Sequence, residues 1–164
     1  MGQSFLPTKE NQRALRDAFG CFATGVTVIT TSTDTGPIGI TANSFSSVSL
    51  DPPLISWCPA KESDRLSAFE ANSDFAIHIL REDQGEMATA FAENGDCFGD
   101  GWRRSQNGVP IYDDCLCVLE CQREAQFDAG DHLIMLGRVH RVHMHQGQPL
   151  VFCHGKFGGF STPS

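Results

Sequence analysis

The sequence contains no long apolar run and no excess of basic charge. None of its hydrophobic stretches approaches the roughly 20 residues that span a bilayer, and the N-terminus shows no basic segment followed by an apolar one. Lysine and arginine together number 12, against 20 aspartate and glutamate residues, which gives a net charge of −8. Because phosphate backbones are bound by clustered basic residues, we expect no membrane span, no secretory signal and no nucleic-acid partner.

Motifs of several common enzyme classes are also missing. The chain has no G-x-S-x-G elbow, which presents the serine of α/β-hydrolases, and no GxxxxGK[ST] loop, which cradles nucleotide phosphates. It also lacks the GxGxxG pattern that follows the first strand of a dinucleotide-binding domain. We therefore expect neither an elbow hydrolase nor a Rossmann domain.

The seven cysteines match neither a disulfide framework nor a common zinc site. Their number is odd, and the spacings of Cys115, Cys117 and Cys121, and of the histidines in 140–145, differ from zinc-ligand patterns. The three cysteines share strand parity, so we expect them on one face of a strand. We expect no metal, cysteines that act as small apolar side chains, and reduced thiols in a cytoplasmic protein.

Length and composition indicate one folded domain. The 164 residues are 40% hydrophobic and 20% charged, which suits a single core that is stable without staples. We expect a flexible N-terminal tail over residues 1–10 and a single domain over residues 11–164.

Hydrophobic periodicity predicts three helices and about seven strands. The helices are expected from Asn11 up to Gly25, from Ser63 or Asp64 onward, and over Gln84–Ala92. The strand-forming segments are Val26–Thr31, Ile38–Ala42, a serine-rich strand that ends at Asp51-Pro52-Pro53, Leu54–Cys58, Phe75–Leu80, Cys115–Ala125, Leu133–His145 and Pro149–Phe152.

The order of these elements predicts a mainly β fold with peripheral α-helices. Strands follow one another through turn residues without the steady strand–helix alternation of a parallel sheet, so an antiparallel barrel is favoured. Residues 93–112 are rich in Gly, Asn and Asp and are expected to form the longest irregular segment. Long loops in compact domains often serve as lids or partner surfaces.

The segment Gly39–Pro53 combines two compositions that rarely occur together. Six small polar residues fall between Thr41 and Ser49, yet Phe45 and Val48 are set among them. A strand and bend whose small side chains let backbone N–H groups approach a polar ligand would explain both features. A serine-rich turn between strands explains the hydroxyl groups equally well.

Three further segments are candidates for ligand contact. A helix that begins at Ser63, just after Lys61, would direct free N–H groups at a phosphate, although a plain capped helix fits equally well. In Gly130-Asp131-His132 the aspartate could fix a histidine that contacts a planar ligand, or the segment is a surface turn. Phe157, beside Lys156, is either a stacking ring or an aromatic plug.

Five segments, in this order, resemble the short-chain flavin reductase family, the FMN-binding split-barrel reductases that serve two-component monooxygenases. They are LRDAFGCFATGVTVITT (Leu15–Thr31), GITANSFSSVSLDPPLISWC (Gly39–Cys58), FAIHIL (Phe75–Leu80) with Gln84 and Phe91-Ala92, GDHLIMLGRV (Gly130–Val139) and GQPLVFCHGKF (Gly147–Phe157). The resemblance covers nearly the whole chain and implies an antiparallel split β-barrel that usually forms homodimers, with the flavin near the interface.

The resemblance also implies the site. The serine-rich segment would hold the flavin, the loop after the next strand would receive its phosphate end, and His132 would lie by the nicotinamide as the candidate catalytic residue. The family often has asparagine where Ala60 or Lys61 stands here. The cofactor-binding residues implied in this way, together with the candidate stacking ring Phe157, are Thr41, Ala42, Asn43, Ser44, Ser46, Ser47, Val48, Cys58, Ala60, Lys61, Ser63 and Phe157.

The implied activity is that of an NAD(P)H:flavin oxidoreductase. It would transfer hydride from NADH or NADPH to FMN or FAD and supply reduced flavin to a partner monooxygenase. Flavin carries the chemistry while the protein supplies position and electrostatics, which accounts for the lack of a catalytic triad. Two other classes stay open: a flavin-holding electron carrier or binding module without nicotinamide turnover, and a structural domain that binds nothing.

Overall fold

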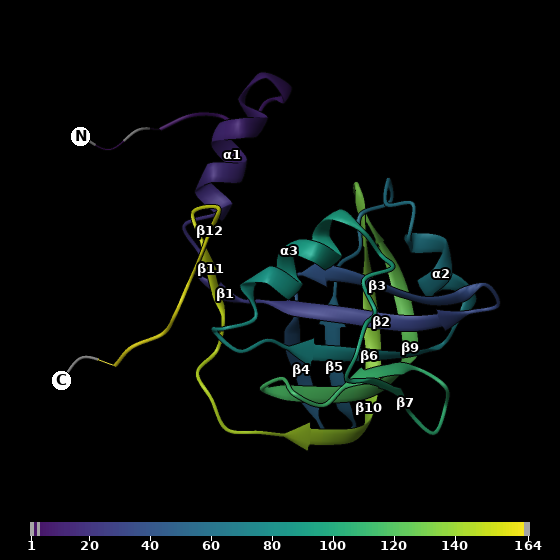
Figure 1. The fold of residues 1–164 in the computed structure, drawn as a ribbon. Coiled ribbons are helices and arrows are strands. Elements are labelled where there is room, and N and C mark those ends of the chain that lie inside the picture. Colours follow the sequence, from purple (N-terminus) through teal and green to yellow (C-terminus); the bar gives the residue numbers. More distant parts are fainter. Residues whose placement is uncertain (1, 3, 163–164) are drawn as a thin grey trace.

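One antiparallel sheet dominates the computed structural model, which describes residue 2 and residues 4–162 (Figure 1). Its strands are hydrogen-bonded in the order β3-β2-β6-β9-β10-β5-β4. In chain order they are β2 (Thr27–Thr33), β3 (Gly36–Ala42), β4 (Ser46–Leu50), β5 (Pro53–Trp57), β6 (Asp74–Ile79), β9 (Cys117–Ala129) and β10 (His132–Met144). The predicted mainly β architecture is confirmed.

Shorter elements surround this sheet. β1 (Thr24–Gly25), β11 (Val151–Cys153) and β12 (Lys156–Gly158) form a second sheet, and β7 (Trp102–Arg104) pairs with β8 (Pro110–Tyr112). The described helices are η1 (Lys9–Asn11), α1 (Gln12–Phe19), α2 (Leu66–Ala71) and α3 (Gly85–Glu93), and none is long and apolar enough to cross a membrane. Residues 1 and 3 of the predicted tail and 163–164 of the predicted domain lie outside the described residues.

The sheet is curled into a barrel, as its connections require. β3 and β4 are the two edge strands, yet only residues 43–45 separate them in sequence. The chain from Ala42 to Ser46 reaches at most about 14 Å, whereas a flat sheet of this many strands would place its edges about 29 Å apart. The two edges must therefore approach each other, and the serine-rich bend lies where the barrel closes.

Each face of the sheet packs into its own core. Ile29 of β2 and Trp57 of β5 share one buried cluster although their strands are not neighbours, which places that cluster inside the barrel. Leu66 and Phe69 of α2 also belong to it. Outside the barrel, α3 and the β7–β8 hairpin cover β2 and β6 through a second cluster that includes Val28, Ala76, Ala88, Phe91 and Ile111.

The segment 93–112 is irregular over residues 94–101 and 105–109, as its composition predicts, but two short strands interrupt it. It contains the β7–β8 hairpin, whose connection includes Gly108 with a φ of 79°. Trp102 packs edge-on against His78 with 5.2 Å between ring centroids, and the backbone N–H of Tyr112 donates to Nε2 of His78 at 3.1 Å. Burial of aromatic surface thus orders a segment whose glycine and polar content favours a loop.

The first helix ends earlier than predicted. α1 stops at Phe19 rather than near Gly25, because Thr24 and Gly25 pair with β11. Figure 1 shows α1 projecting away from the sheet, and Phe19 at its end and Phe22 shortly after it are exposed. The helix is amphipathic, but its apolar stripe does not pack on this chain's own core.

The three cysteines near residue 120 do not share a face. Cys115 lies before β9 in the outer core, whereas Cys121 on β9 lies in the barrel interior. The parity argument fails because β9 begins only at Cys117. Burial raises the pKa of Cys115 and of Cys121 to about 12, so both act as small apolar residues. All seven cysteines are free thiols, and the described residues hold no cluster of three or more potential metal ligands.

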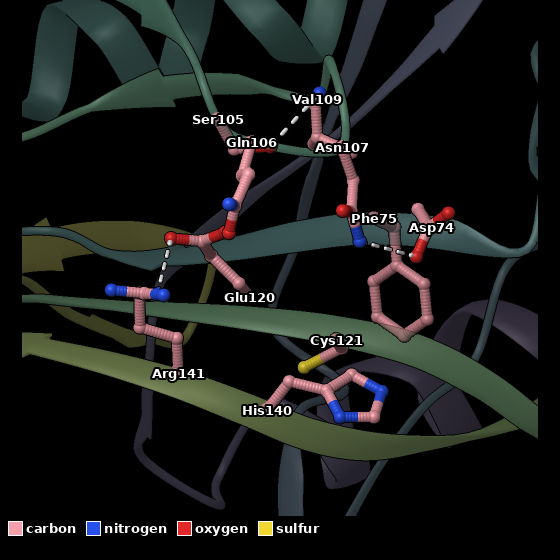
Figure 2. Close-up of a pocket in the computed structure, with 10 residues that line it drawn as sticks. All are labelled: Asp74, Phe75, Ser105, Gln106, Asn107, Val109, Glu120, Cys121, His140 and Arg141. Carbon is pink, nitrogen blue, oxygen red and sulfur yellow. Dashed lines mark hydrogen bonds and ion pairs between the residues drawn. The ribbon is translucent and has the colours of Figure 1, made fainter.

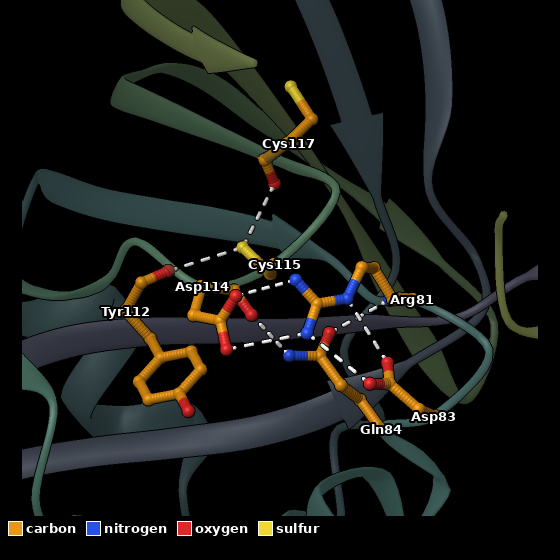
Figure 3. A network of polar contacts seen from close by, with 7 residues as sticks. All are labelled: Arg81, Asp83, Gln84, Tyr112, Asp114, Cys115 and Cys117. Carbon is orange, nitrogen blue, oxygen red and sulfur yellow. Dashed lines mark hydrogen bonds and ion pairs between the residues drawn. The ribbon is translucent and has the colours of Figure 1, made fainter. Parts of the chain in front are cut away.

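A polar network holds the start of α3 (Figure 3). Arg81 forms ion pairs with Asp83 and Asp114 and holds the pKa of both carboxyl groups below their usual range. Gln84, just before α3, accepts the backbone N–H of Arg81 at 2.8 Å and donates to the carbonyl of Asp114. The network ties the end of β6 to α3, which forms one wall of the candidate site.

Candidate functional site

The bend between β3 and β4 presents unpaired backbone amide groups. Asn43, Ser44 and Phe45 form this bend, and none of their N–H groups donates to another described residue. Thr41, near the end of β3, is fixed by a hydrogen bond from its Oγ1 to the carbonyl of Ala88 in α3, at 2.6 Å. The bend can therefore offer N–H donors to a ligand without breaking protein contacts.

β4 continues the bend along an open edge of the barrel. Ser46, Ser47 and Val48 are exposed, and within the described part of the chain β4 pairs with β5 alone. The ladder register shifts between Ser47 and Ser49, which leaves Val48 in an irregularity of the bulge type. A turn at Asp51 and Pro52 leads from this edge strand into β5, so the serine-rich strand ends where the sequence predicts.

A hollow opens beside the end of β3. Its volume is about 190 Å³, and its lining residues are Val26, Thr41, Ala42, Asn43, Ala92, Phe152 and Phe157. The rings of Phe152 and Phe157 lie 5.6 Å apart at an angle of 58° and form an aromatic wall. Apolar walls with a few polar groups are typical of small-molecule sites.

One side chain joins the bend to the loop after β5. Ser44 Oγ accepts the backbone N–H of Cys58 at 2.9 Å and lies 3.4 Å from the Cys58 carbonyl oxygen. Burial raises the pKa of the Cys58 thiol, so this thiol is neutral near pH 7. The contact holds the start of the loop over residues 58–63 against the bend.

The same loop then pairs with the turn before β10. Ala60 forms an isolated β-bridge with His132, and the N–H of Lys61 donates to the carbonyl of Asp131 at 2.9 Å. The Lys61 ammonium group forms an ion pair with Asp128. A phosphate bound at this loop would compete with Asp128 for that ammonium group.

His132 is oriented by its sequence neighbour. Its Nδ1 lies 2.7 Å from Asp131 Oδ1, and the imidazole holds the pKa of Asp131 below its usual range. With Asp131 ionised, Nδ1 carries a proton and Nε2 is the free ring nitrogen. Gly130 completes the turn with a φ of 69°, a conformation that favours glycine.

The helix expected from Ser63 or Asp64 starts later. α2 begins at Leu66 and has six residues, and a turn over residues 61–65 precedes it. Ser63 Oγ accepts the N–H of Arg65 at 3.3 Å, so the serine stabilises this turn rather than the helix. The prediction failed because the preceding loop is anchored to β10, which leaves a turn to be made before helix can form.

Another hollow, of about 210 Å³, lies under the β7–β8 connection and contains none of the predicted site residues (Figure 2). Its polar side chains include Asp74, Asn107, Glu120, His140 and Arg141. Glu120 already accepts from Nε2 of His143 at 2.7 Å, and Asn107 donates to Asp74. Asn107 and Asp74 are therefore bonded to each other, and Glu120 is engaged by a histidine outside the hollow.

The predicted site residues form one continuous band across the barrel closure. The hollow places Phe157 beside Thr41, Ser44 reaches Cys58, and Ala60 reaches His132. Ser46, Ser47 and Val48 extend the band along β4. Sequence reasoning missed Val26, Ala92 and Phe152, because apolar residues of these types occur in every core and carry no chemical signal.

The fold is a β-barrel, and the hollow and the bend together offer apolar rings and free N–H groups of the kind that a flat ligand with polar edges requires. The chain belongs to the flavin reductase like domain family, whose model matches residues 19–161. The family resemblance carried by the five sequence segments is confirmed.

Similar proteins include reductases of two kinds. The chain is 50% identical to "FMN reductase (NADH) SmoA" of Agrobacterium fabrum, over 96% of this chain and 91% of that protein. It is 37% identical to the reductase subunit HsaB of a flavin-dependent monooxygenase of Mycobacterium tuberculosis, over 90% and 81%. Two Rhizobium meliloti relatives are longer, and the chain spans 42% and 56% of their lengths.

Solved structures agree with this assignment. The NADH:FAD oxidoreductase SgcE6 of Streptomyces globisporus, in complex with NAD and FAD fragments, superposes with a TM-score of 0.88 at 33% identity, over 96% of this chain and 98% of that one. BorF, the flavin reductase component of a bacterial tryptophan halogenase, gives a TM-score of 0.86 at 36% identity, over 93% and 99%. The predicted antiparallel split barrel is confirmed.

Proposed function

We propose that this protein is a flavin reductase that oxidises NADH, reduces FMN or FAD and supplies the reduced flavin to a separate monooxygenase component. The observation that carries the proposal is the β3–β4 bend, whose free N–H groups lie beside an aromatic hollow. The 50% identity to an NADH-dependent FMN reductase supports the same reaction.

The chemistry of the hollow fits a flavin. Phe152 and Phe157 offer apolar surface to the face of a ring, while Asn43 and Ser44 offer backbone donors to its polar edge. When bound, flavin supplies the ability to accept hydride, and the protein binds and orients it. N–H groups of the bend would stabilise negative charge that develops on the ring, as an oxyanion hole does.

We assign the remaining predicted residues to the rest of the cofactor. Cys58, Ala60, Lys61 and Ser63 lie on the loop that would receive the phosphate end. Lys61 would exchange its ion pair with Asp128 for the phosphate. Thr41 and Ala42 support the ring edge, and the outer contacts along β4 would come from Ser46, Ser47 and Val48.

His132 is the residue that we propose positions the nicotinamide. Its side chain is 44% exposed, and Asp131 fixes the ring so that Nε2 is free. A free Nε2 can accept a hydrogen bond from an amide group such as the nicotinamide carboxamide. The bridge to Ala60 keeps this ring next to the phosphate loop.

We also propose a cytoplasmic homodimer. Leu50 at the barrel edge is 97% exposed, and the cross-strand pair Phe127 and Ile134 on β9 and β10 is also exposed. The apolar stripe of α1 is uncovered as well. A second copy of the chain could bury these surfaces, and free thiols throughout suit a reducing compartment.

Purified protein separates the three function classes directly. The proposal expects NADH oxidation that depends on added FMN or FAD. Flavin binding without NADH oxidation would favour the electron carrier or binding module. If neither flavin binds, the barrel is a structural domain and the proposal fails.

A further inference from the structure

Arg65 links three parts of the proposed flavin site, although no sequence pattern singled it out. Its side chain is only 12% exposed. The guanidinium group donates to the carbonyl oxygens of Phe91 at 2.5 Å, Ala92 at 3.2 Å and Gly39 at 3.3 Å. Its N–H groups are therefore directed at backbone oxygens of α3 and β3.

These contacts satisfy carbonyl groups that α3 cannot satisfy itself. The last carbonyl groups of a helix have no hydrogen-bond donor within the helix. Here the N–H group of Asn94 donates to the carbonyl oxygen of Ala90 and to no later one. Arg65 donates to the carbonyl oxygens of Phe91 and Ala92. It also brings positive charge to the C-terminal end of α3, where the helix dipole is negative. Asp64 lies 3.7 Å away but is almost fully exposed.

The bonded groups belong to the walls of the site. Ala92 lines the aromatic hollow, and Gly39 lies two residues before Thr41 on β3. Arg65 itself lies two residues after Ser63, at the end of the turn that leads from this loop into α2. One side chain thus connects the wall of the ring hollow, the flavin-binding strand and the proposed phosphate loop.

The surroundings of Arg65 leave little room for adjustment. A Cβ added at Gly95 would lie 3.1 Å from Arg65 Cδ, and the N–H of Gly39 donates to the carbonyl of Gly95 at 2.9 Å. The aliphatic part of the Arg65 side chain therefore lies close against the backbone at Gly95, which is itself bonded to β3. A shorter or apolar side chain would release the end of α3 from the loop.

We propose that Arg65 is a positioning residue for flavin binding, which sets the distance between the phosphate loop and the wall of the ring hollow. The inference rests on the proposed flavin site. Because the guanidinium group is engaged by carbonyl oxygens, Arg65 acts through α3 and the loop rather than by touching the flavin.

Arg123 provides a matched control within the same chain. Its Nη1 donates to the carbonyl oxygens of Phe69 and Glu70, both at 2.8 Å, at the end of α2. It is the same residue type in the same kind of contact, but it touches no part of the site. Loss of Arg123 should therefore lower stability without changing how the enzyme handles flavin.

The experiment compares Arg65→Met, Arg65→Lys and Arg123→Met with the wild type. Melting temperature, kcat and KM are measured with FMN and with riboflavin, which lacks the phosphate. We expect both methionine variants to lower Tm. Arg65→Met should also raise the KM for FMN about tenfold, with a smaller change in kcat and in the KM for riboflavin. Arg65→Lys keeps the positive charge but loses the planar guanidinium group and its several N–H donors. Its KM for FMN should therefore lie between those of the wild type and Arg65→Met.

The opposite results overturn the proposal. If Arg65→Met loses stability but keeps the wild-type KM for FMN and the preference for FMN over riboflavin, Arg65 is a structural residue only. If that variant does not fold, unchanged kinetics of Arg65→Lys overturn the proposal in the same way. A wild type without flavin-dependent NADH oxidation would instead overturn the proposed function, and this inference with it.

Discussion

Small side chains at particular positions leave space for close packing and leave backbone N–H groups free in the proposed site. Gly39 lets the ring of Phe91 rest on β3, since an added Cβ would lie 2.7 Å from two atoms of that ring. Ser44 is short enough to bond the backbone of Cys58 while the N–H groups of the bend stay free. Close approach between backbone and ring is therefore a property of particular positions.

Replacement of Gly39 by alanine tests this close approach. The added methyl group would displace Phe91 and with it α3, so we expect a loss of about 1–3 kcal/mol in the free energy of unfolding and weaker flavin binding. Gly99→Ala is the control, because a Cβ there meets nothing within 4 Å. Urea denaturation and flavin titration measure both effects, and equal results for the two variants would contradict the account.

His132→Ala tests the proposed nicotinamide contact. Loss of one hydrogen bond should raise the KM for NADH about fivefold, with little change in the KM for flavin. His140→Ala, an exposed histidine on the same strand, should leave both constants unchanged. Steady-state kinetics at saturating flavin measure these constants, and an unaltered KM and kcat for NADH would remove His132 from the mechanism.

Residues with distinctive chemistry could be found from sequence, and the others could not. The hydroxyl groups around Asn43 and the Gly-Asp-His turn stand out because their types are unusual for a core or for a strand. Arg65 and Phe152 do not stand out, because their roles depend on contacts with segments that are distant in sequence. Their roles depend on the barrel, which brings α3, β3 and β11 together.

At the scale of elements, His78 fixes the β7–β8 hairpin to the barrel. Its Nδ1 lies 3.0 Å from the carbonyl oxygen of Val28 and its Nε2 accepts the N–H of Tyr112 at 3.1 Å, so only the neutral ring satisfies both contacts. Burial lowers the pKa of His78 from 6.5 to about 4. Between these values the unfolded chain binds a proton that the folded chain does not.

The stabilisation by neutral His78 is therefore complete above about pH 6.5 and is lost as the pH falls toward 4. We expect the free energy of unfolding to fall by about 2 kcal/mol between pH 7 and pH 5 on account of this residue. Urea denaturation of the wild type and of His78→Asn at pH 7 and pH 5 measures this change in the free energy of unfolding, with His140→Asn as the control. If His78→Asn shows the same pH dependence as wild type, the buried histidine is not its source.

Elements were predictable where local pattern and packing agree. The β-branched run that becomes β2 and the helix α3 appear nearly where periodicity places them. The end of α1 and the β7–β8 hairpin were not predictable, because pairing with β11 and packing on His78 are contacts between distant segments. Such contacts override local preference, so composition predicted the irregular parts of residues 93–112 but missed the two short strands within them.

At the scale of the whole molecule, one copy of the barrel leaves apolar side chains such as Leu50, Phe127 and Ile134 exposed to solvent. Phe127→Glu places a charge in the surface that we assign to the homodimer contact and should shift the protein from dimer to monomer. Val142→Glu, another exposed apolar position on β10, is the control. Size-exclusion chromatography with light scattering reports the mass, and a wild-type monomer would contradict the proposed dimer.

The measurement that tests the central claim most directly is an anaerobic mixture of the protein, NADH and FMN or FAD. The loss of NADH and the bleaching of oxidised flavin are followed together. We predict that each NADH oxidised reduces one flavin over many turnovers, and that oxidation stops when flavin is omitted. If neither FMN nor FAD supports NADH oxidation, the protein is not a flavin reductase.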